Sequence, residues 1–547
     1  MKEKGESGLI KRVIENWLTN TNEIGYQIPF CQYLISENHK IISISSHSSI
    51  EQGKDIISID KDGTVHAFQL KGGNIKTAEW RNIQGEIMDL IRIPINHPSV
   101  DISAEHKPFL VTNGLISEPV IKNIADINLK NKQQGYPKLN TIIYPELVQK
   151  FLGIHGSFLP VEPSEFRVFL ELFLSEGDGF LNKDLYANFI ESILFAKSNS
   201  KPSIKRKISS SILLTQYVLQ PYENKKNHIP IIEGWTILCS YMFNLIEKFS
   251  LAEKDWIQSY EIILQKINNQ LEELKKEFIS KENYLEGMPF GDGGEIYKAR
   301  LTIVLGWLSA YELFRNKTES NYEIDNLIYE FIKRLYPKKI WYWGESATPF
   351  FIIMSLVALE FNDKELSNRI ITDIISEITF GNDYKGKGIP SPYISSNEII
   401  SSMHGISEVE IDSMAFHGSS YHLGALVDIL VRRKRRDLLE VVWEEITRIC
   451  KYTFQPDLKA DLFLWRCYNG KTSMKDYKMP QSWNELTIEA TKIDLLTPEV
   501  VNDKLQFMYY FLLCYPHRLN ANTIKCIDSS LKIRQLKSWK GKNIEKK

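Results

Sequence analysis

Hydrophobic and polar positions follow two different patterns along this 547-residue chain. In the first 153 residues, short apolar runs of the kind that form strands alternate with helical patterns. Apolar side chains recur at helical spacing over residues 9–18 and again over residues 77–92. The strand-like runs are 41–45, 55–59, 64–70, 108–112 and 141–144. This alternation predicts an α/β domain with a mixed sheet flanked by helices.

From about Phe166 the pattern becomes helical almost to the end of the chain. The longest amphipathic stretches are 233–249, 252–278, 296–314, 348–361 and 421–436. They do not repeat at a fixed period, so we expect a large all-α C-terminal region with the architecture of an irregular helical solenoid, in one or two units. The predicted division is a domain at 1–153, a Pro- and Gly-containing linker at 154–165 and a helical region at 166–547.

Composition narrows the class of protein. Apolar residues make up 43% of the chain and charged residues 25%, which excludes wholesale disorder. The net charge of −1 excludes a general nucleic-acid binder, so any contact with nucleic acid has to be local. The six cysteines lie far apart without a C-x-x-C pair, which favours free thiols in a reducing compartment. The charged N-terminus and the lack of a 20-residue apolar stretch predict a cytoplasmic protein without a membrane contact.

The segment from Glu51 to Gly73 brings together residues that carry chemistry. Two apolar runs flank a short loop with glycine at its end, which predicts a β-hairpin closed by Asp60 and Thr64. In that register Asp55 lies directly opposite Gln69, with Cβ atoms about 5 Å apart. Lys71, two residues further along, projects from the same face.

An acid, an amide and an ammonium group on one face suit metal-dependent cleavage of a phosphodiester bond. Asp55 would be the main ligand of an Mg²⁺ ion, with the Gln69 side-chain carbonyl and the Leu70 main-chain carbonyl as neutral ligands. Lys71 would orient the attacking water and stabilise charge that develops on the phosphate. A further acid is expected from the first helix. We prefer Glu6, which extends the apolar stripe of that helix, to Glu15, which falls between stripe positions.

The pattern Asp55, then Gln69-x-Lys71 on the next strand, resembles the PD-(D/E)xK nuclease superfamily and specifically its Mrr-like restriction endonuclease branch, which often carries Gln-x-Lys. The residues Phe109-Leu-Val-Thr-Asn-Gly114 are similar to the third core strand of the family, and Thr141–Val148 to its last strand and short helix. The resemblance covers residues 5–152. Lys54 departs from the family pattern, in which Gly or Pro usually precedes the Asp.

The resemblance implies a restriction-endonuclease-like fold and an Mg²⁺-dependent DNA endonuclease, in which Mn²⁺ can substitute. Lys76, Arg81 and Gln84, on or beside the helix 77–92, are candidates for substrate binding; ordinary solvent-facing side chains are an equally good interpretation of the first two. By analogy with the family, we expect a role in bacterial defence against phage or other foreign DNA. A partner protein of a defence system and a homodimer or larger oligomer fit that setting.

Two other functions remain open: a nuclease that acts on RNA or single strands, and an inactive nuclease-like scaffold that binds DNA or a partner.

The sequence also contains a misleading motif, Gly381-Asn-Asp-Tyr-Lys-Gly-Lys387. It fits the first part of a phosphate-binding loop, but Gly388 replaces Ser/Thr and a helix precedes it instead of a strand. We interpret it as a surface loop.

Overall fold

The structure is a computed structural model of the whole chain, in which two compact units are distinguished. Unit 1 comprises Met1–Met242 and Leu251–Asn269, and unit 2 comprises Phe243–Ser250 and Gln270–Lys547. The residues that the structure describes are 11–12, 14–44, 53–95, 97, 99–101, 104–155, 163–195, 201–280, 294–318, 322–336, 340–404, 414–492, 504 and 507–525.

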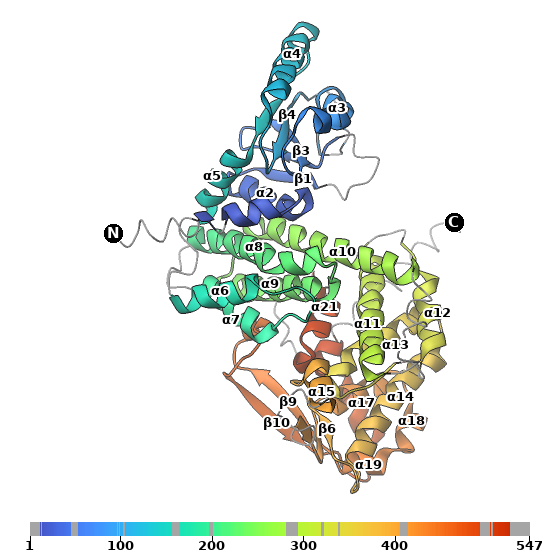
Figure 1. Cartoon of the computed structure of the whole chain (residues 1–547). Helices are drawn as coiled ribbons and strands as arrows, with labels where there is room; N and C mark the ends of the chain where they lie inside the picture. Colours follow the sequence, from blue (N-terminus) through green and yellow to red (C-terminus); the bar gives the residue numbers. More distant parts are fainter. Residues whose placement is uncertain are drawn as a thin grey trace, which may run out of the picture. The chain divides into compact units, whose positions relative to one another are not determined.

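A five-stranded mixed sheet forms the centre of the first part of unit 1 (Figure 1). Its strands are β1 (Lys40–Ile44), β2 (Ile56–Ile59), β3 (Val65–Lys71), β4 (His106–Thr112) and β5 (Asn140–Ile142), in that spatial order. Strand β2 is antiparallel to both of its neighbours, β1 and β3, and β3, β4 and β5 are parallel. The predicted α/β class and mixed sheet are therefore confirmed, whereas the restriction-endonuclease-like fold stays a prediction.

Helices cover both faces of this sheet, and they are α2 (Glu23–Ser36), α3 (Thr77–Arg92), α4 (Glu118–Gln134) and α5 (Tyr144–His155). Helices α3 and α4 pack their apolar stripes on one face, against Val65, Ala67 and Leu110. On the other face, Phe30 of α2 meets Phe68 of β3 at a ring distance of 5.2 Å. Because side chains alternate along a strand, the odd-numbered residues of β3 face α3 and the even-numbered ones face α2.

The β2–β3 hairpin has the register predicted from the sequence. Ile56 pairs with Phe68 and Ile59 with Val65, so position 55 stands opposite position 69. The loop is held by Asp60, which accepts hydrogen bonds from the backbone N–H groups of Asp62 and Thr64. Burial alone would raise the pKa of Asp60, but these bonds and one with His66 lower it to about 2.

The rest of unit 1 is helical. Its helices are α6 (Pro163–Phe173), α7 (Lys183–Leu194), α8 (Lys201–Asn224), and the beginnings of α9 (His228–Phe249) and α10 (Ile257–Ser280), with a 3₁₀ turn, η1 (Glu253–Asp255), between the last two. Helix α8 packs on α2 and α5, so the α/β part and these helices share one packed unit. The predicted linker 154–165 lies mostly outside the described residues; α5 ends at His155 and α6 begins at Pro163.

Helix α9 is the one described segment long and apolar enough to cross a bilayer, and 94% of its most apolar window is buried inside the protein. That degree of burial is typical of a core helix in a folded protein.

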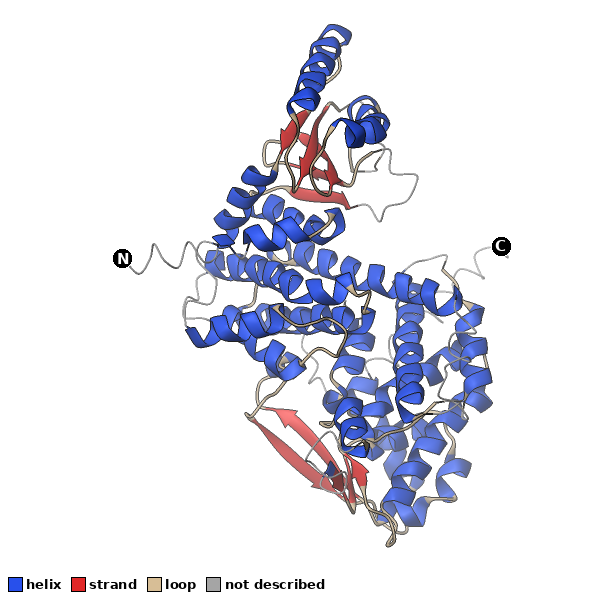
Figure 2. Ribbon diagram, viewed as in Figure 1, coloured by secondary structure: helices blue, strands red, loops and turns tan. Residues whose placement is uncertain are grey.

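Unit 2 contains both helices and strands (Figure 2). Its helices are α11 (Glu295–Thr318), α12 (Asn326–Leu335), α13 (Thr348–Glu360), α14 (Lys364–Gly381), α15 (Ser396–Met403), α17 (Leu423–Arg432), α18 (Arg436–Glu440), α19 (Trp443–Thr447), α20 (Trp483–Thr491) and α21 (Phe507–Cys514). Its 3₁₀ turns are η3 (Glu345–Ala347), η4 (Lys459–Phe463) and η6 (Pro516–Arg518). Its strands are β6 (Ile389–Pro390), β7 (Ala415–Phe416), β8 (Ser419–Ser420), β9 (Cys450–Pro456) and β10 (Gly470–Lys475).

The predicted all-α character of residues 166–547 is wrong in one respect. Strands β10, β9 and β8 form a three-stranded sheet, and β6 pairs with β7. Strand β10 is exposed along almost its whole length, so its residues do not show the apolar alternation that identifies a half-buried strand. The long helices predicted at 233–249, 252–278, 296–314, 348–361 and 421–436 are confirmed with small shifts of their ends.

Candidate active site

Asp55 stands at the beginning of β2 with its carboxylate turned toward β3. Its backbone N–H donates to the Phe68 carbonyl at 2.8 Å, which extends the hairpin ladder by one residue. Its carboxylate oxygen Oδ2 accepts a 2.6 Å hydrogen bond from the backbone N–H of Leu70, and only 4% of the residue is exposed. The sheet itself therefore fixes this carboxylate beside Gln69.

Gln69 has a buried oxygen without a partner. The side chain is 4% exposed, and its Oε1 atom has no hydrogen-bond partner in the part of the chain that the structure describes. Its Nε2 atom lies 3.5 Å from Oε2 of Glu86 on α3. Buried polar atoms are usually paired, so this carbonyl, next to a carboxylate, is available to a cation or to a water molecule.

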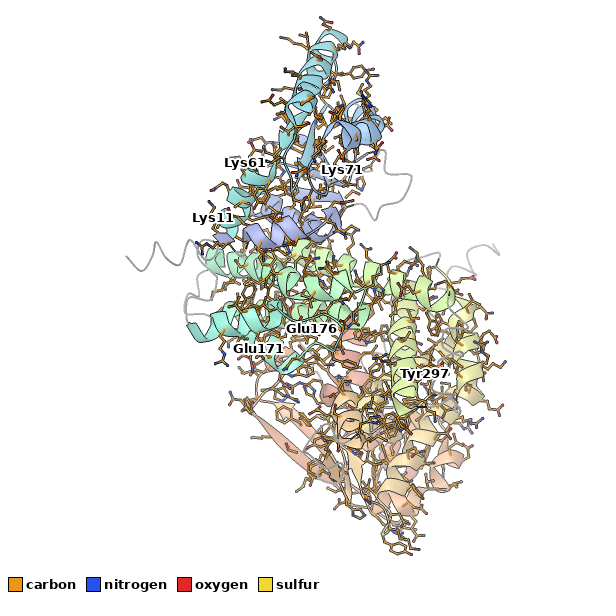
Figure 3. All side chains as sticks on the ribbon, viewed as in Figure 1. Lys11, Lys61, Lys71, Glu171, Glu176 and Tyr297 are labelled. Carbon is orange, nitrogen blue, oxygen red and sulfur yellow. The ribbon has the colours of Figure 1, made fainter. Side chains whose placement is uncertain are left out.

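Lys71, labelled in Figure 3, is the last residue of β3. Because side chains alternate along a strand, it projects from the same face as Gln69. Its Nζ atom donates to Glu86 Oε2 at 2.6 Å, and 22% of its side chain is exposed. The sequence prediction that Asp55, Gln69 and Lys71 share a face is confirmed by the register of the hairpin and by the contacts of Gln69 and Lys71 with the same carboxylate.

Glu86 is a member of the site that the sequence analysis missed. Its carboxylate contacts both Gln69 and Lys71, although 49% of its side chain is exposed. Gln84, the polar residue selected on this helix, is likewise exposed. The helical periodicity does not distinguish Glu86 from Gln84, because both lie at the borders of the buried apolar stripe that contains Trp80 and Ile87. The choice depends on how α3 crosses the hairpin.

Gly53 sets that crossing. It adopts a positive φ of +72°, and a Cβ atom at this position would lie 2.3 Å from the Glu86 carbonyl oxygen. Only glycine allows both the left-handed backbone and this close approach of the hairpin to α3. The approach brings the helix to the strand ends that carry Asp55 and Lys71.

Lys54, the departure from the family pattern, has a structural explanation. The residue is only 6% exposed, and its Nζ atom lies 3.5 Å from the Asp89 carbonyl in the last turns of α3. Burial lowers the pKa of Lys54 to about 8. A cation near the C-terminal end of a helix interacts favourably with the helix dipole, so Lys54 serves the packing of α3.

Tyr26 of α2 positions the end of β3. Its hydroxyl donates toward the carbonyl oxygens of Lys71, at 2.9 Å, and Val111, at 3.1 Å, and it accepts from the Lys71 backbone N–H at 3.2 Å. Burial raises the pKa of Tyr26 well above its ordinary value, so the hydroxyl keeps its proton. Strand β3 is thus tied to α2 at Lys71, the residue that carries the ammonium group.

We expect the substitution Tyr26→Phe to lower the free energy of unfolding by about 1–3 kcal/mol, because it leaves buried backbone groups without their partner. Urea denaturation measures this loss. Tyr33→Phe, on the same helix, is the matched control: that hydroxyl accepts from Lys150 at a half-buried position, and its removal should change stability by roughly 0.5 kcal/mol or less. Equal stability of the Tyr26→Phe variant and the wild type would contradict the positioning role.

The Thr112-Asn113-Gly114 segment joins β4 to the loop that follows Lys71. The Asn113 side chain accepts from the Gly73 N–H and donates to the carbonyls of Leu18 and Thr21. Thr112 donates to the Gly73 carbonyl at 2.6 Å. These bonds hold the end of the first helix against the strand ends that bear the site.

The remaining predicted site residues are placed as follows. Lys76, Arg81 and Gln84 are exposed along α3, where they stay candidates for substrate binding. Glu6 lies outside the described residues. Glu15 pairs with Lys11 at 3.7 Å and is partly exposed, as expected for the less favoured acid. Glu23, which no sequence pattern singles out, carries an Oε2 atom 2.6 Å from where a Cβ of Gly72 would stand, next to Lys71.

The donor set fits a hard cation better than a soft one. No cluster of three or more His, Cys, Asp or Glu side chains suited to a metal occurs in the described ranges. The available oxygens are those of Asp55, the orphaned Gln69 carbonyl and Glu86, and Mg²⁺ typically takes one or two carboxylates and keeps several waters. The Leu70 main-chain carbonyl stays a predicted ligand.

We expect Glu86→Gln to raise the Mg²⁺ concentration needed for half-maximal cleavage by roughly tenfold, since loss of a carboxylate at a metal site has an effect of about that size. Initial rates over an Mg²⁺ titration measure it, with Glu118→Gln on α4, an exposed carboxylate of the same fold, as control. A lower rate at an unchanged half-maximal concentration would mean that Glu86 acts only through Lys71.

The chain was compared with protein families, curated proteins and solved structures. No family model, curated protein or solved structure matches the chain. The functional assignment therefore depends on the geometry around Asp55, Gln69, Lys71 and Glu86.

Proposed function

We propose that the chain is a metal-dependent nuclease that hydrolyses phosphodiester bonds in DNA, with Asp55, Gln69 and Lys71 as its catalytic residues. One observation carries the proposal: the buried Asp55 carboxylate and the unpartnered Gln69 carbonyl stand opposite each other, beside a lysine that contacts a further carboxylate. Oxygen ligands for a divalent cation beside a lysine suit metal-dependent phosphodiester hydrolysis.

Each residue has a distinct task in this proposal. Asp55, oriented by the Leu70 N–H, and the Gln69 carbonyl supply oxygens to an Mg²⁺ ion, and Mn²⁺ can take its place. When bound, the cation lowers the pKa of a water and neutralises charge on the phosphate. Lys71 donates a hydrogen bond to the attacking water or to a phosphate oxygen and stabilises the charge that develops there. Glu86 orients the lysine through their 2.6 Å contact and offers a further carboxylate oxygen to the cation.

The cellular setting follows from the family resemblance and is part of the same proposal. A cytoplasmic endonuclease of this kind would act against phage or other foreign DNA, together with a partner protein or as a homodimer or larger oligomer. The helical remainder of the chain would then recognise a partner or restrain the nuclease.

Cleavage assays with the full chain test the proposal. Supercoiled plasmid, linear duplex, single-stranded DNA and RNA are each incubated with Mg²⁺, Mn²⁺ or EDTA. We expect nicking of the plasmid with either metal and none in EDTA. Cleavage restricted to RNA or single strands would replace the duplex substrate by that alternative. Binding of DNA without cleavage of any substrate would favour the inactive scaffold, for which the uncharged Gln69 is the structural argument.

A further inference from the structure

Three large aromatic side chains are exposed on two segments of unit 2 whose backbones pair with each other, outside the proposed active site. Phe380, at the end of α14, is 78% exposed, Tyr384 is 79% exposed and Phe416 of β7 is 54% exposed. Single exposed apolar residues are common on protein surfaces, whereas several on paired segments are a candidate interaction surface. We call residues 380–388 and 415–418 together the aromatic knob.

Backbone hydrogen bonds fold the first half of the knob into a tight turn. The Gly388 N–H donates to the Gly381 carbonyl at 2.8 Å, and the Gly386 N–H donates to the Asp383 carbonyl at 2.7 Å. Gly388 has a positive φ of +85°, and a Cβ atom there would lie 2.6 Å from the Phe416 backbone. The glycines of the apparent phosphate-binding motif therefore serve turn geometry and close contact.

The second half of the knob is bonded to the first. Ile389 pairs with Phe416 in the β6–β7 ladder. The Asn382 side chain accepts from the Gly418 N–H at 2.6 Å, and a ring nitrogen of His417 lies 2.9 Å from the Asp383 carbonyl. The exposed aromatic rings thus stand on a hydrogen-bonded frame, which limits the entropy lost when a ligand binds.

Cations accompany the rings. Lys385 and Lys387 are exposed, and the Lys385 Nζ atom stands 5.2 Å from the centre of the Tyr384 ring. Asp383 is the one acid in residues 380–388, so this turn has a net positive charge. Aromatic rings next to lysines complement a chain of bases joined by phosphates, because bases stack on the rings while the cations meet the backbone.

We propose that the aromatic knob binds single-stranded nucleic acid, with bases stacked on Phe380 and Tyr384 and phosphates contacted by Lys385 and Lys387. The choice of this occupant rests on the proposed nuclease function, which makes a polynucleotide the natural partner of a cationic aromatic surface. Base stacking is tolerant of sequence, so the knob supplies affinity for strands without selecting a recognition site.

The test measures binding without cleavage. Full-length protein carrying Asp55→Asn is titrated in EDTA against fluorescein-labelled oligo(dT), oligo(U) and a duplex, and anisotropy is followed. Adding Phe380→Ala or Tyr384→Ala should weaken single-strand binding at least about fivefold each, and adding Lys385→Ala should lower its salt dependence. The two oligonucleotides distinguish DNA from RNA. Tyr468→Ala removes an aromatic ring that is 93% exposed elsewhere in unit 2 and should leave the affinity unchanged.

Three results would overturn the proposal: unchanged affinity in both aromatic variants, an equal loss in Tyr468→Ala, or ring-dependent binding to phosphatidylglycerol vesicles but not to oligonucleotides. Because no cleavage is needed, the two proposals fail separately. A chain that cleaves nothing but loses single-strand binding in Phe380→Ala would refute the nuclease and keep the knob. A chain that cleaves with metal while binding does not depend on the knob would do the reverse.

Discussion

Replacing Asp55 by asparagine is expected to lower the rate of Mg²⁺-dependent cleavage by roughly 10²- to 10³-fold, the effect typical of removing a group that stabilises charge in the transition state. Asparagine has the same shape, and its carbonyl can still accept the Leu70 N–H that holds Asp55 in place. The variant should therefore fold normally and lose only the negative charge. Initial rates of plasmid nicking at saturating Mg²⁺ measure the loss.

Asp62→Asn provides the matched control for this experiment. Asp62 belongs to the same hairpin but is exposed in its loop, where only its backbone N–H makes the bond to Asp60. Its substitution removes one carboxylate from the hairpin without touching the site, so the rate should stay the same. Equal rates for wild type and Asp55→Asn would show that cleavage, if present, arises elsewhere in the chain.

The substitution Gly53→Ala is expected to cause the second large effect, a loss of both stability and activity. A left-handed backbone costs a residue with a Cβ atom about 1–2 kcal/mol. The clash with the Glu86 carbonyl adds about 1–3 kcal/mol, because α3 or the hairpin has to move. We expect a loss of stability of roughly 2–5 kcal/mol. Displacement of Asp55 relative to Glu86 should also lower activity by about 10²-fold, since misplacement by about 1 Å has that effect.

A substitution at Gly63 distinguishes the cost of the left-handed backbone from the cost of the clash with α3. It has a positive φ of +83° at the other end of the same hairpin, but nothing lies within 4 Å of where its Cβ would stand. Gly63→Ala therefore carries only the backbone cost and should keep full activity. Urea denaturation and nicking assays on both variants provide the comparison. A similar small loss in both would mean that the contact between Gly53 and α3 does not position the site.

Helix α2 connects the site to the helical part of unit 1. Tyr26 bonds the end of β3, and the same helix packs on α8. Just before this helix, the Thr21 hydroxyl donates to the Gln220 side chain of α8 at 3.0 Å. A change in the packing of α8 would therefore bear directly on the strand that carries Lys71. This arrangement gives a physical route by which the helical region could restrain the proposed nuclease.

The register of the β2–β3 hairpin could be predicted from local sequence alone. The turn residues Asp60 to Thr64 and the apolar runs on either side determine the register, and register alone places Asp55 opposite Gln69. The helix 77–92 was likewise predicted with its observed ends, because its apolar stripe is long and regular. Strand β10 was missed because an exposed edge strand has no buried face to impose alternation on its sequence.

Local patterns therefore determined the strands of the first 153 residues, the long helices and three residues that share one face of the sheet. They could do so because turn geometry and burial periodicity act over a few neighbouring residues. The tertiary structure alone decided that Glu86, and not Gln84, meets Lys71, and that Tyr26 holds the end of β3. Those contacts join residues 15 and 45 positions apart, and they depend on the close approach of α3 at Gly53 and the packing of α2 under the sheet. No pattern within a single element records how two elements cross.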